Sequence, residues 1–294
     1  MLQLRGITKR YGERLVLDDV SFEVRPGRLT GFVGGNGAGK TTTMRIVLGL
    51  LSDNGGQTTL DGAPLTAEDR RSFGYMPEER GLYPKMKVLE HIVYLARLHG
   101  FTKETATSKA SDLLEQLGLQ ERFGDTVESL SLGNQQRAQI AAALVHDPQI
   151  LILDEPFSGL DPLAVETVVG VLQERASAGA AVLFSSHQLD VVERLCDDLV
   201  IIADGTVRAA GSREELRAAY SSNRYRLTGE ADTGWLRHEP GVRVVEFDGG
   251  SAQFDVDDAA TAQRVLRGAL DRGAVSSFVP QQPSLAQIFT EVIQ

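Results

Sequence analysis

Apolar and polar residues alternate along positions 2–25, and Gly12 and Glu13 interrupt the alternation. A period of two is typical of strands with one buried face, so this stretch predicts two strands joined by a turn. The unbroken apolar run at positions 29–33 predicts a further, buried strand. Apolar residues at helical spacing follow from Met44 to Leu51, so a helix comes next.

Helices and strands continue to alternate as far as Tyr220, which is typical of an α/β fold with a parallel sheet. Apolar spacing predicts helices at about 88–100, 106–117, 130–146, 163–176 and 213–220. Apolar runs predict strands at 57–60, 150–153 and 180–185 and a hairpin at 200–210. Residues 54–56 are expected to form a turn, and residues 73–84, with two prolines and two glycines, a loop.

The composition changes after Tyr220, which predicts an accessory domain over residues 221–294 beside a first domain of residues 1–220. Residues 221–223 have the polar composition of a linker. Strands predicted at 225–227, 242–247, 253–256 and 275–279, with a helix at 260–270, indicate a small α+β domain. Trp235 is expected in its core. The domain either regulates or stabilises a dimer, or is a packing appendage.

A glycine-rich segment lies between the strand at 29–33 and the following helix, which is the context of a phosphate-binding loop. Backbone N–H groups of such a loop converge on phosphates, a lysine adds charge and a hydroxyl can bind Mg²⁺. The expected ATP ligands are Gly34, Asn36, Gly37, Ala38, Gly39, Lys40, Thr41 and Thr42, with Thr41 also on Mg²⁺. The alternatives are a glycine-rich turn without a ligand and a dinucleotide fingerprint, whose wider second glycine gap is absent here.

Two carboxylates, Asp154 and Glu155, follow the apolar strand at 150–153, and ligand sites form at such strand ends. Asp154 can hold the Mg²⁺ shell and Glu155 can polarise a water for attack on the γ-phosphate. The alternative is an acidic turn without chemistry. His187 follows the strand at 180–185 and either donates to the γ-phosphate or is a surface or packing residue.

Two further positions have a functional and a structural interpretation. Tyr11 stands beside the first turn, where it can stack on a purine ring or be an ordinary surface tyrosine. Ser131 and Gly133 lie at the start of the helix at 130–146, where an uncrowded helix N-terminus can bind an anion presented by a second subunit. The alternative for Ser131 is an N-cap.

Composition limits the class of function. The formal net charge of −10 over 294 residues disfavours a general nucleic-acid surface, and we expect no nucleic-acid partner. No apolar run approaches the roughly 18 residues that span a bilayer, and the N-terminus has no signal-peptide core, so we expect a cytoplasmic chain. The single cysteine, Cys196, suits a reducing compartment and is interpreted as a packing thiol.

The order of these segments resembles the ATP-binding subunits of ABC transporters across residues 1–220. The matching segments are the Walker A loop, signature, Walker B strand, D-loop, switch histidine and adenine-stacking aromatic, at 34–42, 130–134, 151–155, 158–161, His187 and Tyr11. The resemblance implies a P-loop NTPase core of the ABC type with an antiparallel β subdomain and a helical signature subdomain, inserted at about 85–146. The small C-terminal α+β domain would follow this core.

The resemblance also implies a mechanism. Two copies would close head to tail, so that Ser131 and Gly133 of one approach ATP held by the other, and Asp161 of the D-loop would also bind the nucleotide. Glu155, His187 and Glu78 would be catalytic, and Thr41, Asp154 and Glu78 would hold Mg²⁺. ATP-driven closure and opening of this homodimer would power an exporter through a separate integral-membrane subunit, which holds the chain at the inner face of the cell membrane. The alternative is a soluble ABC-type ATPase switch with a non-membrane partner.

Several positions depart from the family pattern. Glu78 stands where most members have a glutamine that contacts Mg²⁺ and the attacking water, so it adds negative charge. Leu132 and Asn134 replace the usual glycine and glutamine of the signature, and Gly35 replaces a common proline. The run from Tyr75 to Pro84, the signature and the C-terminal domain look similar to the exporter branch that includes bacterial sodium and drug efflux ATPases. The segment from Arg80 to Pro84, aromatic and charged, is expected to contact the membrane subunit.

Overall fold

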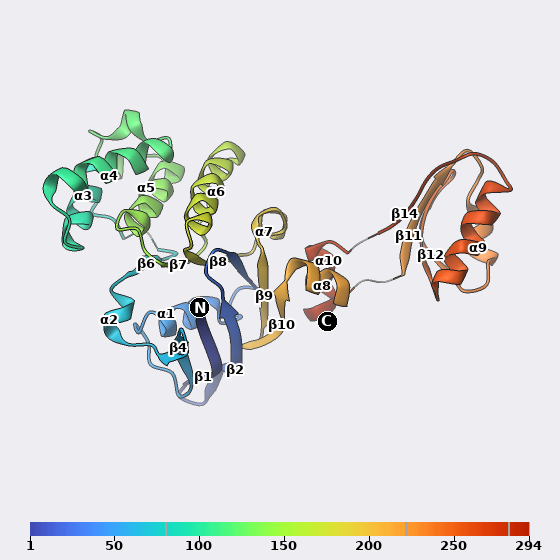
Figure 1. Ribbon diagram of the computed structural model, residues 1–294, viewed down its shortest axis with the longest axis horizontal. Helices are drawn as coiled ribbons and strands as arrows, with labels where there is room; N and C mark the ends of the chain where they lie inside the picture. The colour runs from blue at the N-terminus through green and yellow to red at the C-terminus, as the bar shows by residue number, and fades with distance from the viewer. Residues whose placement is uncertain (80, 221–222, 282, 294) are drawn as a thin grey trace. The chain divides into compact units, whose positions relative to one another are not determined.

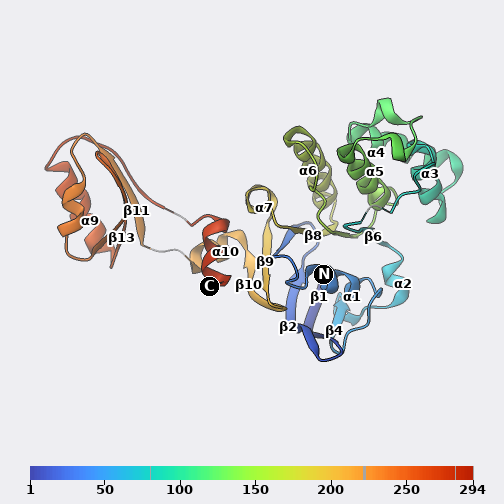
Figure 2. The same ribbon diagram turned by 180° about the vertical axis from the view of Figure 1, so that it is seen from behind.

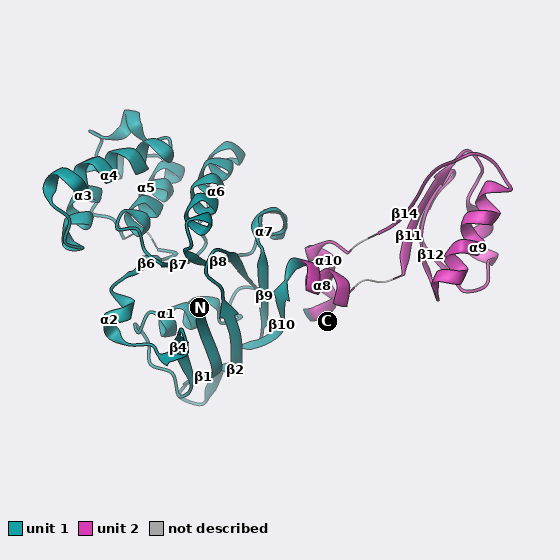
Figure 3. Cartoon of the chain, viewed as in Figure 1, with its two compact units in different colours: residues 1–213, 293 teal, residues 214–292, 294 magenta. Residues whose placement is uncertain are grey.

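The computed structural model describes residues 1–79, 81–220, 223–281 and 283–293. These residues form two compact units, 1–213 with Ile293 and 214–292 (Figure 3). The boundary predicted from the sequence lies after Tyr220, whereas in the structure α8 (Arg213–Ala219) belongs to the second unit from Glu214 onward. The expected linker residues Ser221 and Ser222 lie outside the described residues.

A six-stranded sheet with the order β10-β9-β3-β8-β7-β6 forms the centre of the first unit (Figure 1). The strands are β3 (Leu29–Val33), β6 (Phe73–Met76), β7 (Ile150–Leu153), β8 (Ala181–Ser186), β9 (Asp198–Ala203) and β10 (Thr206–Ser212). Five strands are parallel, and β10 runs antiparallel to β9 at one edge. Every residue of β3, β7, β8 and β9 is buried, as expected for parallel strands covered on both faces.

A second, antiparallel sheet has the order β2-β1-β4-β5. Its strands are β1 (Leu2–Tyr11), β2 (Arg14–Val24), β4 (Gly55–Leu60) and β5 (Ala63–Pro64). The predicted turn at Gly12 and Glu13 joins β1 to β2, so the alternating pattern identified this hairpin correctly.

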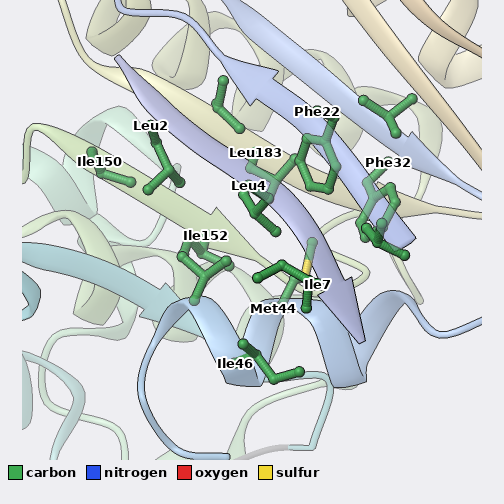
Figure 4. Packing of buried hydrophobic residues seen from close by; sticks show 14 of the residues in the cluster. Leu2, Leu4, Ile7, Phe22, Phe32, Met44, Ile46, Ile150, Ile152 and Leu183 are labelled. Atoms are coloured by element: carbon green, nitrogen blue, oxygen red, sulfur yellow. The ribbon is translucent and has the colours of Figure 1, made fainter. Parts of the chain in front are cut away.

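The main hydrophobic core combines side chains from both sheets and α1 (Lys40–Val47). Figure 4 shows Leu4 and Phe22 of the antiparallel sheet close to Leu183 of β8, with Met44 of α1 nearby. The helix that follows the phosphate loop is therefore packed into the core along one side, which fixes the position of its N-terminus. The α/β fold with an antiparallel β subdomain is confirmed.

The first unit contains six further helices and two 3₁₀ turns among the described residues. They are α2 (Ala67–Arg70), α3 (Val88–Leu98), α4 (Lys103–Gln116), α5 (Leu132–Leu144), α6 (Pro162–Ser177) and α7 (Leu189–Leu195), with 3₁₀ turns η1 (Gln120–Arg122) and η2 (Val127–Ser129). Helices α3, α4 and α5 pack on one another as a helical insert (Figures 1 and 2). The insert falls within the range 85–146 that the sequence predicts.

The prediction of a loop throughout residues 73–84 was wrong at its start, because Phe73–Met76 is strand β6 and pairs with β7. Gly74 belongs to the strand for a packing reason. A Cβ atom there would lie 2.3 Å from the backbone oxygen of Ala143, so only glycine lets α5 approach β6 this closely. The predicted turn at residues 54–56 was also partly wrong, since β4 begins at Gly55.

The second unit contains an antiparallel sheet of order β12-β13-β11-β14, as the α+β prediction required. The four strands are β11 (Arg224–Gly229), β12 (Val242–Asp248), β13 (Ser251–Val256) and β14 (Val275–Pro280). The remaining elements are η3 (Gly234–His238), α9 (Ala259–Leu270) and α10 (Leu285–Ile293). Trp235 packs against the core around Phe254, and the Arg272 guanidinium lies 4.2 Å from its ring centroid. Sequence analysis did not predict α10.

We expect Gly74→Ala to destabilise the first unit by roughly 1–3 kcal/mol, because the added methyl overlaps backbone rather than a movable side chain. Thermal and urea unfolding monitored by circular dichroism would measure the change. Gly170→Ala, in α6, is the matched control, because no atom lies within 4 Å of an added Cβ there. The free energy of unfolding of the control should equal that of the parent or exceed it by up to about 1 kcal/mol, because alanine has a higher helix propensity than glycine. Equal stability of the two variants would contradict the packing argument.

Candidate functional site

The phosphate loop joins the buried strand β3 to α1, as its sequence predicts. Gly37 and Gly39 adopt left-handed φ values of 78° and 109°. A Cβ atom at Gly39 would also lie 2.5 Å from Leu17 Cδ2, so the loop is held close against β2. The glycines thus allow both the turn and its tight packing, and the N-terminus of α1 faces outward as a site for an anion.

Lys40 lies folded within this loop. Its side chain donates hydrogen bonds from Nζ to the backbone oxygens of Gly34 at 2.7 Å and Gly35 at 3.2 Å. The residue is only 8% exposed, so its charge is held inside the loop by carbonyl dipoles. These contacts keep the cation beside the N-terminus of α1, where a phosphate would bind.

Asp154 accepts two short hydrogen bonds at the carboxyl end of β7. Thr41 Oγ1 donates to its Oδ2 at 2.7 Å, and Ser185 Oγ donates to its Oδ1 at 2.6 Å. Asp154 is 1% exposed, and two hydroxyl donors compensate the loss of water. Sequence analysis missed Ser185; its polar side chain at the end of the apolar strand β8 was the available signal.

Glu155 follows with an unusual backbone, a φ of 54° in the left-handed region. Its backbone N–H donates to Ser185 Oγ at 2.8 Å. Its carboxylate Oε2 lies 2.9 Å from Nδ1 of His187, which follows β8. The two side chains that the sequence singled out separately therefore meet, and the mostly exposed imidazole of His187 orients a mostly buried carboxylate.

A cleft of about 530 Å³ lies over these groups. Its lining comprises Tyr11, Arg14, Val16, Asn36, Gly37, Ala38, Gly39, Lys40, Thr41, Thr42, Glu78, Asp154 and Glu155. Eleven of these residues are among the predicted site residues, whereas Arg14 and Val16 were missed because strand alternation alone marks no ligand contact. Of the predicted residues that the structure describes, Gly34, Ser131, Gly133, Asp161 and His187 do not line this cleft.

Family comparisons agree with this geometry. A family model described as ABC transporter matches residues 17–158. The ABC transporter ATP-binding protein YhaQ of Bacillus subtilis is 35% identical over 293 residues, 100% of this chain and 98% of its own length. The chain belongs to the family of ABC transporter ATP-binding proteins. It is therefore an ATP-binding and ATP-hydrolysing subunit.

Other comparisons cover part of the chain. The Nod factor export ATP-binding protein I of Cupriavidus metallidurans is 37% identical over 219 residues, 74% of this chain and 72% of its own length. The dimeric structure of the bacterial ABC transporter cassette MJ0796 matches with a TM-score of 0.66 and 25% identity, over 72% of this chain and 98% of that one. Residues 211–293 match a model described as ATP-binding protein DrrA1-3-like, C-terminal domain.

The ABC signature residues begin α5, away from the cleft of the same chain. Ser131 is the N-cap, and its hydroxyl accepts a hydrogen bond from the Asn134 N–H at 3.3 Å. A Cβ at Gly133 would lie 3.3 Å from the backbone oxygen of Gly159 in the D-loop. Asp161 accepts from the Ala164 N–H at 2.8 Å and caps α6. Both polar side chains thus have a structural role in the single chain.

Three further side chains have environments that bear on their interpretation. Tyr11 lines the cleft and is 51% exposed, with Lys9 Nζ 5.3 Å from its ring centroid. Glu78 reaches the cleft between two backbone carbonyls that Gln139 holds. Cys196 is buried, and burial raises the pKa of its thiol, which agrees with a packing role. Within the ranges described, no helix is both long and apolar enough to cross a bilayer.

We expect Lys40→Ala to lose most ATP binding, because the loop then lacks its buried cation and phosphate charge is left without a partner. Titration with a fluorescent ATP analogue would measure a fall in affinity of at least roughly tenfold, the scale of one charge-assisted contact. Lys85→Ala, an exposed lysine outside the cleft lining, is the control and should bind like the parent. ATP affinity that stays at the parent value in Lys40→Ala would refute the role of the phosphate loop.

Proposed function

We propose that this chain powers a membrane exporter as a homodimer beside a separate membrane-spanning subunit, at the inner face of the cell membrane. The proposed role in ATP hydrolysis rests on two contacts beside the phosphate loop. Thr41 contacts Asp154, and the neighbouring Glu155 contacts His187. The export function draws support from the relative named for Nod factor export. It is also compatible with the absence of a membrane-crossing helix from the described part of the chain.

Each side chain at the cleft has a proposed task in ATP hydrolysis. Lys40 and the N-terminus of α1 bind the β- and γ-phosphates, and Tyr11 stacks on the adenine. Glu155 accepts a proton from the attacking water, while His187 holds the carboxylate and donates to the γ-phosphate. The preorganised Glu155–His187 contact reduces the rearrangement needed before reaction.

A magnesium ion fits the oxygen donors present. The Thr41 hydroxyl and the Asp154 carboxylate already contact one another, and Glu78 lines the same cleft, so hydroxyl and carboxylate oxygens are available. When bound, Mg²⁺ would neutralise part of the triphosphate charge. These three side chains would hold it, with Ser185 fixing the orientation of Asp154.

ATP would also join two copies of the chain. Ser131, Gly133 and Asp161 lie outside the cleft of their own chain, which agrees with contacts to ATP bound by a partner. The MJ0796 cassette is a dimer in its solved structure. Closure around ATP and opening after loss of the γ-phosphate would form a linkage cycle that can do work on the membrane subunit. The exposed Tyr83 belongs to the proposed membrane-subunit contact, while Arg80 lies outside the described residues.

We expect Glu155→Gln to keep ATP binding and lose roughly 10² to 10⁴ in turnover, the usual scale for a general base. Phosphate release and ATP titration would measure the two effects, and size-exclusion chromatography with ATP should show accumulated dimer. Glu166→Gln is the matched control, because this exposed carboxylate pairs with Arg194 outside the cleft. Turnover in Glu155→Gln equal to that of the control would rule out the proposed base.

The exporter role is tested by the partner. A tagged chain purified from detergent-solubilised membranes of its native cell should carry a polytopic membrane protein in stoichiometric amount, identified by mass spectrometry. Cells with the tag alone provide the control. Recovery solely from cytosol, with ribosomes or without a stable partner, would overturn the transport role and leave an ABC-type ATPase switch.

A further inference from the structure

Helix α5 contains two buried glutamines, each of which binds two backbone carbonyls outside the helix. Gln136 Nε2 donates to the oxygens of Glu155 at 2.9 Å and Pro156 at 3.1 Å. Gln139 Nε2, one turn later, donates to the oxygens of Pro77 at 2.6 Å and Glu79 at 3.3 Å. Both glutamines are 3% exposed. One helix therefore holds the two segments that bring carboxylates to the ATP cleft.

The Gln136 contact fixes a strained residue from one side. Glu155 has its φ of 54°, and a non-glycine residue stays in the left-handed region only when its surroundings determine its backbone. Ser185 binds the Glu155 N–H and Gln136 binds its carbonyl, so both polar groups of this peptide backbone are held by side chains. The direction in which the carboxylate leaves the backbone follows from these two contacts.

The Gln139 contact has the same form at the other carboxylate. Its two acceptors, Pro77 and Glu79, flank Glu78, which lines the cleft. Gln139 Oε1 is buried and has no hydrogen-bond partner among the described residues. A buried unpaired oxygen is unfavourable, so the side chain is not optimal for stability alone. The hydrogen bonds that Gln139 Nε2 donates to Pro77 and Glu79 explain why a glutamine stands at this position.

We infer that Gln136 and Gln139 are positioning residues through which α5 sets Glu155 and Glu78 for catalysis. Ser131 is the N-cap of the helix, about 7.5 Å along its axis from Gln136, so a contact at the helix N-terminus would move the two amides with it. This inference rests on the proposed function, in which Ser131 meets ATP held by the partner copy. When Ser131 of one copy contacts the ATP held by its partner, α5 of that copy would shift. This shift would move Glu155 and Glu78 of the same copy.

The test uses Gln136→Met and Gln139→Met in the full chain, since methionine keeps the length of the side chain and removes both donors. Gln135→Met is the matched control, because Gln135 Nε2 also donates to two carbonyls, Val127 and Leu130, both of which lie in the helical insert. Single-turnover hydrolysis of γ-labelled ATP gives the rate of the chemical step. Titration with a fluorescent ATP analogue gives the affinity.

We expect Gln136→Met to slow hydrolysis about 10- to 100-fold, the scale of a displaced catalytic group, with ATP affinity changed less than about twofold. Gln139→Met should show the same split to a smaller extent, and the control should keep both values. In a Glu155→Gln background, Gln136→Met should cost no further rate, because it acts through that carboxylate.

Three outcomes would overturn the inference: an unchanged rate in Gln136→Met, the same fold-loss with and without Glu155, or joint loss of ATP binding and hydrolysis, which would assign the amide to the fold. Failure of the proposed function gives a different result. In that case Glu155→Gln alone would hydrolyse ATP at the parent rate, whatever the glutamine variants do.

Discussion

The hydrogen bond between Thr41 and Asp154 joins the two halves of the site, and most of the remaining geometry depends on it. Thr41 lies in the first turn of α1, whereas Asp154 directly follows β7, which is separated from β3 by β8. A carboxylate that is 1% exposed is unfavourable unless donors replace water, and here hydroxyls from α1 and β8 do so. The parallel sheet brings these three strand ends to one edge, and the buried charge fixes their relative positions.

The same sheet edge explains how strain is retained at Glu155. Its left-handed backbone is unfavourable by about 1–3 kcal/mol for such a residue. Ser185 serves both Asp154 and the Glu155 N–H, so one hydroxyl connects the two carboxylate residues. The Gln136 amide closes the other side. The cost of the strained backbone is thus offset by contacts that also orient the carboxylate.

Sequence alone predicted those parts of the site that follow one another along the chain. The phosphate loop and the strand ending in Asp154 and Glu155 have local patterns, because each depends on a single strand and the turn after it. The order of the motifs along the chain is enough to identify the ABC family. The predicted ligand-binding and catalytic roles of all the site residues remain predictions, since they concern bound ligands and, for Ser131 and Gly133, a partner copy.

Other features could not be predicted because they depend on contacts between distant residues. Strand β6 contains Gly74, which local rules assign to a loop, and only its fit against Ala143 explains the glycine. Glutamine is common on exposed helix faces, so nothing in the sequence distinguishes Gln136 and Gln139. Their hydrogen-bond partners lie 19 to 62 residues away along the chain. No periodicity marks such a pair. Helix packing determines which glutamine is buried, and therefore which one matters.

The charge of the cleft places a further constraint on ATP binding. Among the lining residues, Arg14 and Lys40 provide two cations against the three carboxylates Glu78, Asp154 and Glu155, a net charge of −1 before any phosphate arrives. Backbone N–H groups at the start of α1 contribute about half a positive charge, which does not balance a triphosphate. The divalent cation proposed for this cleft would reduce that excess of negative charge. A neutral glutamine in place of Glu78 would remove one of the three negative charges, so under the proposed function the carboxylate would make nucleotide binding more dependent on that cation.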